Sequence, residues 1–531
     1  MVVTRRACVA GLAVALAALL AGAGTVRAAE YFVSPSGDDA NPGTSDGKAL
    51  KTIARAADMA APGDTVNIAP GKYVERVKMP RSGTAEAPIT LRRRGDGEVV
   101  WTTPEPDPPR FQDTYALCIE GREHIVVEGL TFRDCKAWIV LWESNRCTVR
   151  DCTFDGVRTY NALRINNGSF NKVLNCRFLR AQKQTGFREG SSWIPVPGAD
   201  YIEIFRGSHN NLVEDCTFGR ITHTAVSISA FDPKQFSPTR NIVRENVFTD
   251  PYWKCLWFHA GKHNVFEWNL CTGQAANFVQ LESGTSIIRY NRFTHYRDST
   301  NAQPDVLLRG AIRMQYDFAQ RNRIYNNLFY DNDRTLTNNS FRWHVTDNIF
   351  KNNIFFRNRQ TIFLGFPDYT TKNRNYFLSN VILQKEPGEK VIRLMRSDDF
   401  TLAEAAAKLG DLYRGNVESD PLFRNAEKGD FHLKAGSPCQ DAGSHLTVAA
   451  SAGQGRQVAV KDSLWFCDGN GLIDGDRIIV GSNKAVRIDK VDYEKHMLQV
   501  NRTINWKLGD PVNLVHEGKA PDIGPVEYEA E

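Results

Sequence analysis

A short hydrophobic phrase repeats along the middle of the chain: an aliphatic residue, then Asn or Cys three positions later, then Phe two positions after that. Ten anchors of this phrase follow one another at intervals of 22 to 40 residues: Leu130, Cys152, Cys176, Cys216, Asn246, Asn269, Asn291, Asn327, Asn353 and Asn380. Phe stands two positions after eight of these ten anchors. The short alternating runs within each repeat have no helical period, so they predict β-strands.

The repeat predicts an all-β fold, a right-handed parallel β-helix solenoid of roughly ten to thirteen coils. Coils stacked about 4.8 Å apart place like residues above one another. We therefore expect a stack of Phe rings in the core, with Phe154, Phe178 and Phe218 as neighbours. We also expect a ladder of Asn side chains at a turn, because Asn tolerates a left-handed backbone and pairs through its amide.

The same pattern predicts how the chain is divided. The expected segments are a signal peptide over 1–28, the β-helix domain over 29–447, a small β module over 448–514, inserted or appended, and a closing segment over 515–531. The module is expected because this stretch lacks the Asn and Phe phrase and has denser strand and turn patterns. Two short helices are expected near the ends of the solenoid, an N-terminal cap within Ala49–Ala60 and a second helix over Leu402–Leu409.

The first residues have the features of an export signal. Arg5 and Arg6 precede an apolar stretch, and Val26-Arg27-Ala28 provides a small-residue cleavage site. We therefore predict a secreted or periplasmic protein, cleaved near Ala28, with no membrane span in the mature chain.

Ten of the eleven cysteines follow this signal, and an exported protein would favour disulfides. Cys152, Cys176 and Cys216, however, occupy the anchor of the repeated phrase. We expect these three to be stacked free thiols, since a free cysteine is a good small core residue. The sequence leaves the state of Cys439 and Cys467 open.

Composition and charge narrow the choice of partner only slightly. The chain is 42% hydrophobic and 24% charged, which is typical of a globular protein. Loss of the three arginines of the signal lowers the formal net charge from +5 to +2. So small a charge gives no argument for nucleic acid, and we expect a monomer that binds none.

Several motifs outside the repeat resemble a known family. The opening phrases begin at Tyr31, Pro62 and Pro70 (Tyr-Phe-Val-Ser-Pro-Ser-Gly, Pro-Gly-Asp-Thr-Val, Pro-Gly-Lys-Tyr), and Asp420-Pro-Leu-Phe and Asp430-Phe-His-Leu belong to a closing phrase. Together they are similar to pectate-lyase-like secreted β-helix proteins, among them pectate, alginate and chondroitin lyases and some glycoside hydrolases. The resemblance implies a parallel β-helix and a polysaccharide partner, which we expect to be anionic.

The outward positions of one strand column are where chemistry is expected. They read Arg164, Glu203, Ser227, Trp257, Gln280, Arg313 and Arg342 in a first column, and Asn166, Phe205, Ser229, His259, Glu282, Gln315 and His344 in a second. Such side chains on successive coils predict a binding groove, walled by insertions over 181–201, 230–240 and 297–310. The alternative is a ladder of paired charges that only solvates the sheet.

Residues of this face have the chemistry to bind an acidic sugar. The expected substrate-binding residues are Arg164, Glu203, Trp257, Gln280, Gln315, Arg342, Tyr316 and Lys254. Trp257 offers a flat apolar surface to a sugar ring, and arginine binds carboxylate or sulfate bidentately.

The expected catalytic residues are His259, Glu282, Arg313 and His344. Elimination at a uronic acid needs a group that neutralises the substrate carboxylate, a base for the C5 proton and a donor to the leaving oxygen. Arg313 or Arg342 would neutralise the carboxylate. His259, oriented by Glu282 on the adjacent coil, would be the base, and His344 or Tyr316 the donor.

The comparison with alginate and chondroitin lyases adds two expectations. His259 corresponds to a position near the arginine of those enzymes, and Lys254 and Lys262 are loose substitutes for their catalytic lysine. The sequence itself requires no cofactor, while the resemblance allows for Ca²⁺ on a loop without indicating its ligands.

Two other functions remain open at this point. A glycoside hydrolase would need a second carboxylate near Glu282, such as Asp317 or Asp305, since Glu203 lies three coils away, roughly 14 Å by strand spacing. A non-catalytic polysaccharide-binding or surface protein would need no acid or base at all.

Overall fold

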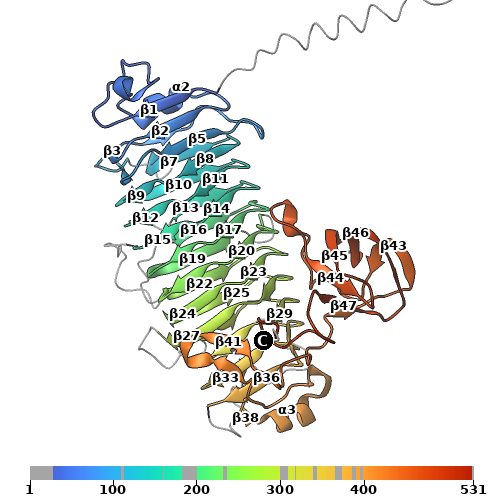
Figure 1. The fold of residues 1–531 in the computed structure, drawn as a ribbon. Coiled ribbons are helices and arrows are strands. Elements are labelled where there is room, and N and C mark those ends of the chain that lie inside the picture. The colour runs from blue at the N-terminus through green and yellow to red at the C-terminus, as the bar shows by residue number, and fades with distance from the viewer. Residues whose placement is uncertain are drawn as a thin grey trace, which may run out of the picture.

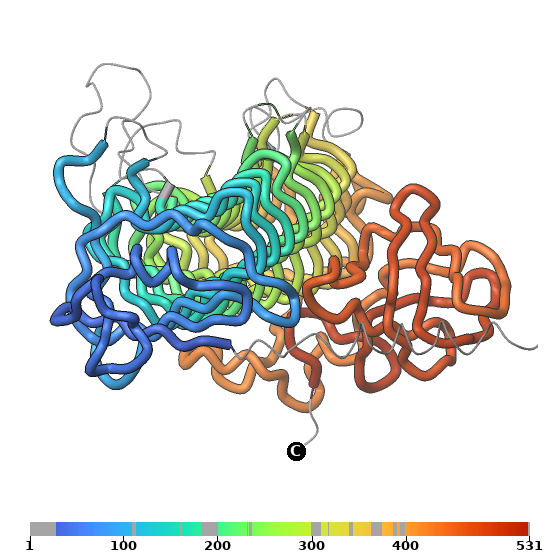
Figure 2. The backbone as a smooth tube through the Cα atoms, turned by 90° about the horizontal axis from the view of Figure 1, so that it is seen from above, coloured from blue at the N-terminus to red at the C-terminus, as the bar shows by residue number. Residues whose placement is uncertain are grey.

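The chain winds into three long parallel sheets, with a separate antiparallel sheet at its C-terminal end (Figure 1). The computed structural model describes residues 28–108, 113–158, 161–181, 200–230, 232, 236–298, 309–316, 318–338, 344–364, 374–385, 390–394 and 399–528. Seen from above, successive coils lie over one another and the C-terminal module lies to one side (Figure 2). The all-β solenoid predicted from the repeat is confirmed.

Each coil contributes one short strand to each of the three sheets. Sheet 1 contains β1 (Glu30–Val33), β2 (Thr65–Ile68), β5 (Ile89–Arg93), β8 (Ile125–Glu128), β11 (Thr148–Arg150), β14 (Lys172–Leu174), β17 (Leu212–Glu214), β20 (Ile242–Arg244), β23 (Val265–Glu267), β26 (Ile287–Arg289), β29 (Arg323–Tyr325), β32 (Ile349–Lys351), β35 (Tyr376–Leu378) and β39 (Tyr413–Arg414). Sheet 2 contains β4 (Val77–Lys78), β7 (Tyr115–Glu120), β10 (Ala137–Trp142), β13 (Asn161–Asn166), β16 (Asp200–Phe205), β19 (Ile221–Ser229), β22 (Tyr252–Phe258), β25 (Asn277–Leu281), β28 (Ile312–Met314), β31 (Leu336–Asn338), β34 (Ile362–Leu364), β37 (Ile392–Leu394) and β38 (Asp399–Phe400). Sheet 3 contains β3 (Gly71–Val74), β6 (Val99–Thr102), β9 (Thr131–Arg133), β12 (Thr153–Asp155), β15 (Arg177–Phe178), β18 (Thr217–Phe218), β21 (Val247–Thr249), β24 (Leu270–Ala275), β27 (Arg292–Asp298), β30 (Leu328–Tyr330), β33 (Ile354–Asn358) and β36 (Val381–Gln384).

The predicted Phe stack fills the core along sheet 3. Ring centroids are 4.8 Å apart for Phe154 and Phe178 and 4.7 Å apart for Phe178 and Phe218, in stacked geometry. Such offset stacks add to the burial of apolar area. The prediction that these three rings lie one above another is confirmed.

The predicted Asn ladder runs along the turn that leads from sheet 1 to sheet 3. Asn269 shows the pattern: its Nδ2 donates to Asn291 Oδ1 at 3.0 Å, and its own Oδ1 accepts from the backbone N–H and Nδ2 of Asn246. Each buried amide thus satisfies a backbone group of the adjacent coil. The cysteines at the same position, Cys176 and Cys216, are free and buried, as expected, and Cys439 and Cys467 are also free.

Helices cover only the ends of the solenoid. Helix α2 (Ile53–Met59) is shorter than the predicted cap because Thr52 caps it, accepting from the Arg55 N–H. Helix α3 (Leu402–Leu409) has the predicted bounds and begins at a capping box of Thr401 and Glu404. Within the described residues, four short 3-10 turns are also present: η1 (Asp46–Lys48), η4 (Gly410–Leu412), η5 (Ala426–Lys428) and η6 (Gly469–Gly471).

The C-terminal part of the chain forms a short hairpin and then an antiparallel module. The hairpin is β40 (Phe423–Asn425) with β41 (Asp430–Leu433), and the module contains β42 (Thr447–Val448), β43 (Gly453–Ala459), β44 (Arg477–Val480), β45 (Val486–Asp492), β46 (Met497–Trp506) and β47 (Pro511–Leu514). The module packs on the outward face of sheet 1, where Ile242 and Val265 share an apolar cluster with Phe466. The middle of sheet 1, from β17 to β29, is therefore covered by the chain itself.

Several predictions concern residues that the structure does not describe. The export signal falls on residues 1–27, outside the described part, and most of the three predicted wall insertions lies outside it too. Among the described residues, no helix is long and apolar enough to cross a membrane.

Candidate functional site

The polar face predicted from the sequence lies on the outward side of sheet 2. Strand pairing places Trp257 beside Ser227 on one side and Gln280 on the other, and Gln280 beside Arg313. Glu203 pairs with Arg164 and Ser227 in the same column. The first column is therefore continuous from β13 to β28, and most of the predicted site residues share one face.

The last coil of the predicted columns is wrong. Arg313 pairs with Thr337 and Met314 with Asn338, so the strand of the next coil is β31 and not the stretch that contains Arg342 and His344. His344 is exposed and lies past the strand, where its carbonyl accepts from Gln320 Nε2 at 3.1 Å. Arg342 lies outside the described residues. His344 therefore does not lie in the strand to which the sequence assigned it.

Glu282 lies at the centre of the polar cluster. Its side chain is 1% exposed, and Oε2 accepts a hydrogen bond of 2.9 Å from Trp257 Nε1 while Oε1 accepts one from Gln280 Nε2. A buried carboxylate is stable only where hydrogen bonds and opposite charges compensate for lost hydration. Trp257 and Gln280 supply the hydrogen bonds, and both come from positions that the sequence predicted.

Two cations balance this carboxylate. Lys254, on β22, is 4% exposed, and its Nζ lies 4.1 Å from the centre of the Trp257 ring. Burial lowers the pKa of Lys254 to about 8, against the opposing effect of Glu282 and Asp200. Burial also lowers the pKa of Arg313, again opposed by Glu282. Lys254 and Arg313 therefore both interact with Glu282, and Asp200 acts on Lys254 as a second carboxylate.

His259 lies at the solvent side of Glu282. Its Nε2 is 3.9 Å from Glu282 Oε2, and its ring centre is 4.7 Å from that of Trp257. Burial lowers the pKa of His259. The charge of Glu282 opposes this shift, and the charge of Lys254 adds to it. The ring also hydrogen-bonds the backbone of Ala230. A neutral imidazole that donates one N–H to a carbonyl keeps its other nitrogen as an acceptor.

Gln315 and Tyr316 follow Arg313 on the same coil, which is the coil after that of Glu282. Burial and the nearby Glu282 raise the pKa of the Tyr316 phenol, and a hydrogen bond with Gln315 opposes this. Within the described part of the chain, Arg313 Nε and Gln315 Oε1 are buried and have no hydrogen-bond partner. Buried polar atoms of this kind are costly unless a ligand or water satisfies them.

Arg164 and Glu203 are brought to the same face but not to the cluster. Arg164 Nε lies 3.0 Å from Glu203 Oε2, and Ser229 Oγ donates to Glu203 Oε1. Burial raises the pKa of Glu203 to about 7. Glu203 is therefore compensated by its own neighbours, three coils from Glu282 as the sequence predicted.

The structure adds a pair that the sequence reasoning missed. His223 Nδ1 lies 2.5 Å from Asp200 Oδ1, and the His223 ring meets Trp257 edge-on at 5.6 Å. Asp200 shares a register column with Thr224, Lys254 and Asn277. All four residues of this third column are polar, which was the signal available in the sequence.

The described residues of the cluster do not fit a calcium ion. Calcium prefers about six to eight oxygen ligands, usually with several carboxylates. Here both Glu282 oxygens already accept hydrogen bonds, and the charges nearest to it are cationic. Within the described residues, no group of three or more His, Cys, Asp or Glu could hold a metal ion.

Comparison with known proteins places this site in a family. The family model described as chondroitinase B matches residues 48–394, which is well over half of the chain and includes the whole cluster. The chain belongs to the chondroitinase B family. This is a family of polysaccharide lyases, so the expected relation to the β-helix lyases is confirmed.

Individual relatives are distant from this member of the family. The uncharacterized protein YwoF of Bacillus subtilis (strain 168) is 23% identical over 77% of this chain and 92% of its own length. Among solved structures, pectate lyase Pel9A has a TM-score of 0.43 at 14% identity, over 94% of this chain and 96% of its own. The PL6 family alginate lyase AlyGC has a TM-score of 0.48 at 14% identity, over 77% of this chain and 56% of its own.

Proposed function

We propose that this protein cleaves an acidic polysaccharide by β-elimination at a uronic-acid residue, bound at the cluster around Glu282. One observation carries the proposal: a neutral histidine, His259, lies beside a buried carboxylate that is flanked by two buried cations. This combination provides a base and an anion-binding site within one small surface. Membership of a polysaccharide-lyase family supports the same reaction class.

Lys254 and Arg313 would bind the substrate carboxylate. Both side chains are cations, and their charges complement the carboxylate of a uronate. Binding the carboxylate there withdraws electron density from C5 and makes its proton more acidic. Arg313 Nε would donate to the carboxylate and Gln315 Oε1 would accept from a hydroxyl of the sugar, since neither atom has a hydrogen-bond partner among the described residues. Trp257, half-buried beside them, would contact the apolar face of the ring.

His259 would remove the C5 proton and Tyr316 would protonate the leaving oxygen. The C5–H electron pair forms the C4–C5 double bond as the C4–O bond breaks, so no water is consumed. Glu282 stabilises the imidazolium that results, because its Oε2 is 3.9 Å from His259 Nε2. The raised pKa of Tyr316 keeps the phenol protonated, as an acid requires.

The test panel consists of alginate, chondroitin sulfate, dermatan sulfate, polygalacturonate and a neutral glucan. Each is incubated with the protein, and the ultraviolet absorbance of an unsaturated sugar and the number of new reducing ends are both recorded. Elimination predicts that both signals rise together on at least one uronate polymer and that the neutral glucan gives neither. New reducing ends without absorbance would establish hydrolysis. Retention of a polymer with neither signal would establish binding alone.

A further inference from the structure

A pocket opens on sheet 2, several coils N-terminal of the Glu282 cluster. It has a volume of about 460 Å³ and is lined by residues of β4, β7, β10 and β13. This volume lies in the range of small-ligand sites, about 300–1,000 Å³. The functions predicted from the sequence give this pocket no role, although one of its lining residues, Arg164, is an expected substrate-binding residue.

Part of the pocket lining is apolar and aromatic. Tyr115 and Val140 form a small apolar cluster on the outward face of the sheet, and Cys118 and Trp142 pack against it. Trp142 is only half-buried, so part of its ring surface is accessible. An aromatic surface of this kind stacks on the apolar face of a sugar ring.

Cationic side chains surround this lining. Arg76, Lys78 and Arg164 line the pocket, with Asp113 and Glu120 as the acidic members. Arg76 donates to Asp107 and to the Pro104 carbonyl, both at 2.8 Å, and its Nε is buried without a hydrogen-bond partner among the described residues. Each of these cations already has a carboxylate partner, Asp107, Glu120 and Glu203 respectively, so Arg76 Nε is the group that an anionic ligand would satisfy.

The pocket is continuous with the cluster along the first outward column. Strand register runs from Arg164 through Glu203 and Ser227 to Trp257, one coil at each step. These three steps cover roughly 14 Å. One extended chain lying along sheet 2 can therefore reach both places.

We infer that this pocket is a distal binding site for an acidic sugar of the same polysaccharide that is cleaved at Glu282. The sugar ring would lie on Trp142, and Arg76 with the exposed Lys78 would bind its carboxylate or sulfate. This inference rests on the proposed function for the class of ligand only. It predicts that long chains bind more tightly than short ones, because only long chains occupy both sites.

Cys118 gives a direct measurement of occupancy. It is half-buried, whereas the other nine cysteines of the described chain are buried. Burial raises its pKa to about 11, so alkylation is followed at alkaline pH. Long alginate or dermatan sulfate fragments, at about ten times their Kd, should slow this alkylation about tenfold, and disaccharides should not. Cys118→Ser identifies the labelled site by removing the signal.

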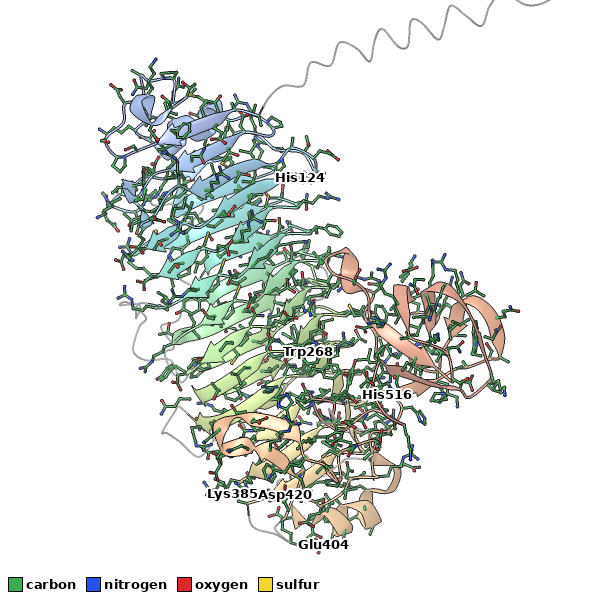
Figure 3. The ribbon with its side chains drawn as sticks, in the orientation of Figure 1. His124, Trp268, Lys385, Glu404, Asp420 and His516 are labelled. Carbon is green, nitrogen blue, oxygen red and sulfur yellow. The ribbon has the colours of Figure 1, made fainter. Side chains whose placement is uncertain are left out.

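Two variants test the pocket separately from the chemistry. Trp142→Ala, and Lys78→Gln at an exposed position that cannot disturb folding, should raise KM about tenfold for long chains with kcat unchanged. Trp268→Ala is the matched control, because Trp268 is 48% exposed and lies on the side of the solenoid that carries the module (Figure 3).

The outcomes separate the two proposals. One outcome would overturn the distal site and leave the proposed elimination intact. In that outcome the protein forms unsaturated product, long chains do not protect Cys118, and both variants have an unchanged KM. Protection of Cys118 without any unsaturated product would establish the distal site and overturn the proposed elimination.

Discussion

Glu282 illustrates how one residue organises this site. Its two oxygens accept from Trp257 and Gln280, and its charge opposes the burial effects on Lys254, His259 and Arg313. A carboxylate that is 1% exposed and accepts a hydrogen bond on each oxygen is poorly accessible to a sugar as a nucleophile. At the scale of single residues, Glu282 is therefore a positioning group, and the proton transfer falls to its neighbours.

Substitution of His259 tests the base. His259→Gln keeps a polar side chain at a position where the ring is one-third exposed, so the free energy of unfolding should change by less than about 1 kcal/mol. The kcat should fall about 100-fold or more, because general-base catalysis contributes that much. Thermal unfolding and initial rates measure the two effects. Unaltered kcat would remove His259 from the mechanism.

The pH dependence of kcat/KM tests the assignment of the two titrating groups. The base must be neutral, so activity should fall as pH drops through the pKa of His259, which burial places below its usual 6.5. The cation must be charged, so activity should also fall as pH rises through about 8, where Lys254 loses its proton. Lys254→Arg should retain activity and move the alkaline limit upward. An inactive Lys254→Arg, together with activity that rises through pH 8, would make Lys254 the base instead.

At the scale of elements, the coils are held in register by the Asn ladder. Asn269 donates to Val243 O, Glu267 O and Asn291 Oδ1 while accepting from Asn246. The register of sheet 2 follows from this ladder, since each coil contributes one strand to every sheet. The site therefore depends on amides that lie on the other side of the core.

Removal of one ladder amide should have a large effect on stability. Asn269→Ala leaves the buried backbone N–H of Asn246 without its acceptor, and the carbonyls of Val243 and Glu267 each lose one hydrogen bond. We expect the free energy of unfolding to fall by about 3 kcal/mol, because each buried orphan costs about 1–3 kcal/mol. Gln274→Ala, an exposed position on the same coil, should change it by less than about 0.5 kcal/mol. Urea unfolding of both variants makes the comparison, and equal midpoints would contradict a structural role for the ladder.

These elements explain which parts of the site could be predicted. The columns were correct up to Arg313 because the Asn and Phe phrase fixes every coil until then. The predicted columns failed at Arg342 and His344 because β31 was not recognised as a strand. At its second inward position β31 has Asn338, where an aliphatic residue was expected. Asp200 and His223 were missed because Tyr201 and Ile202 both face the core, which interrupts the alternation from which the outward positions were counted.

At the scale of the whole molecule, the C-terminal module is joined to the solenoid by a buried ionic network. Arg289 donates to both carboxylate oxygens of Asp476, at 2.8 and 2.6 Å, and to Glu267 and the Tyr325 hydroxyl. The side chain of Arg289 is only 5% exposed. The module covers the middle of sheet 1, whereas the candidate site lies on sheet 2.

Breaking this network should loosen the module without affecting the chemistry. Asp476→Ala leaves Arg289 buried with a single carboxylate, which should cost about 3 kcal/mol. We expect faster proteolysis within 447–514 and an earlier calorimetric transition, with kcat unchanged. Asp474→Ala is the control, because the Asp474 pair with Arg487 is exposed and should contribute less than about 1 kcal/mol. Identical proteolysis of the two variants would show that the Arg289 network does not hold the module.

Cleavage in isotope-labelled water tests the central claim most directly. The polysaccharide that the panel identifies is digested in that medium, and the products are weighed by mass spectrometry. Elimination predicts fragments with a double bond, whose summed mass equals that of the starting chain and which contain no oxygen from the solvent. One labelled oxygen for every bond cleaved would mean that water attacks the sugar, and the assignment of His259, Lys254 and Arg313 to an elimination would be wrong.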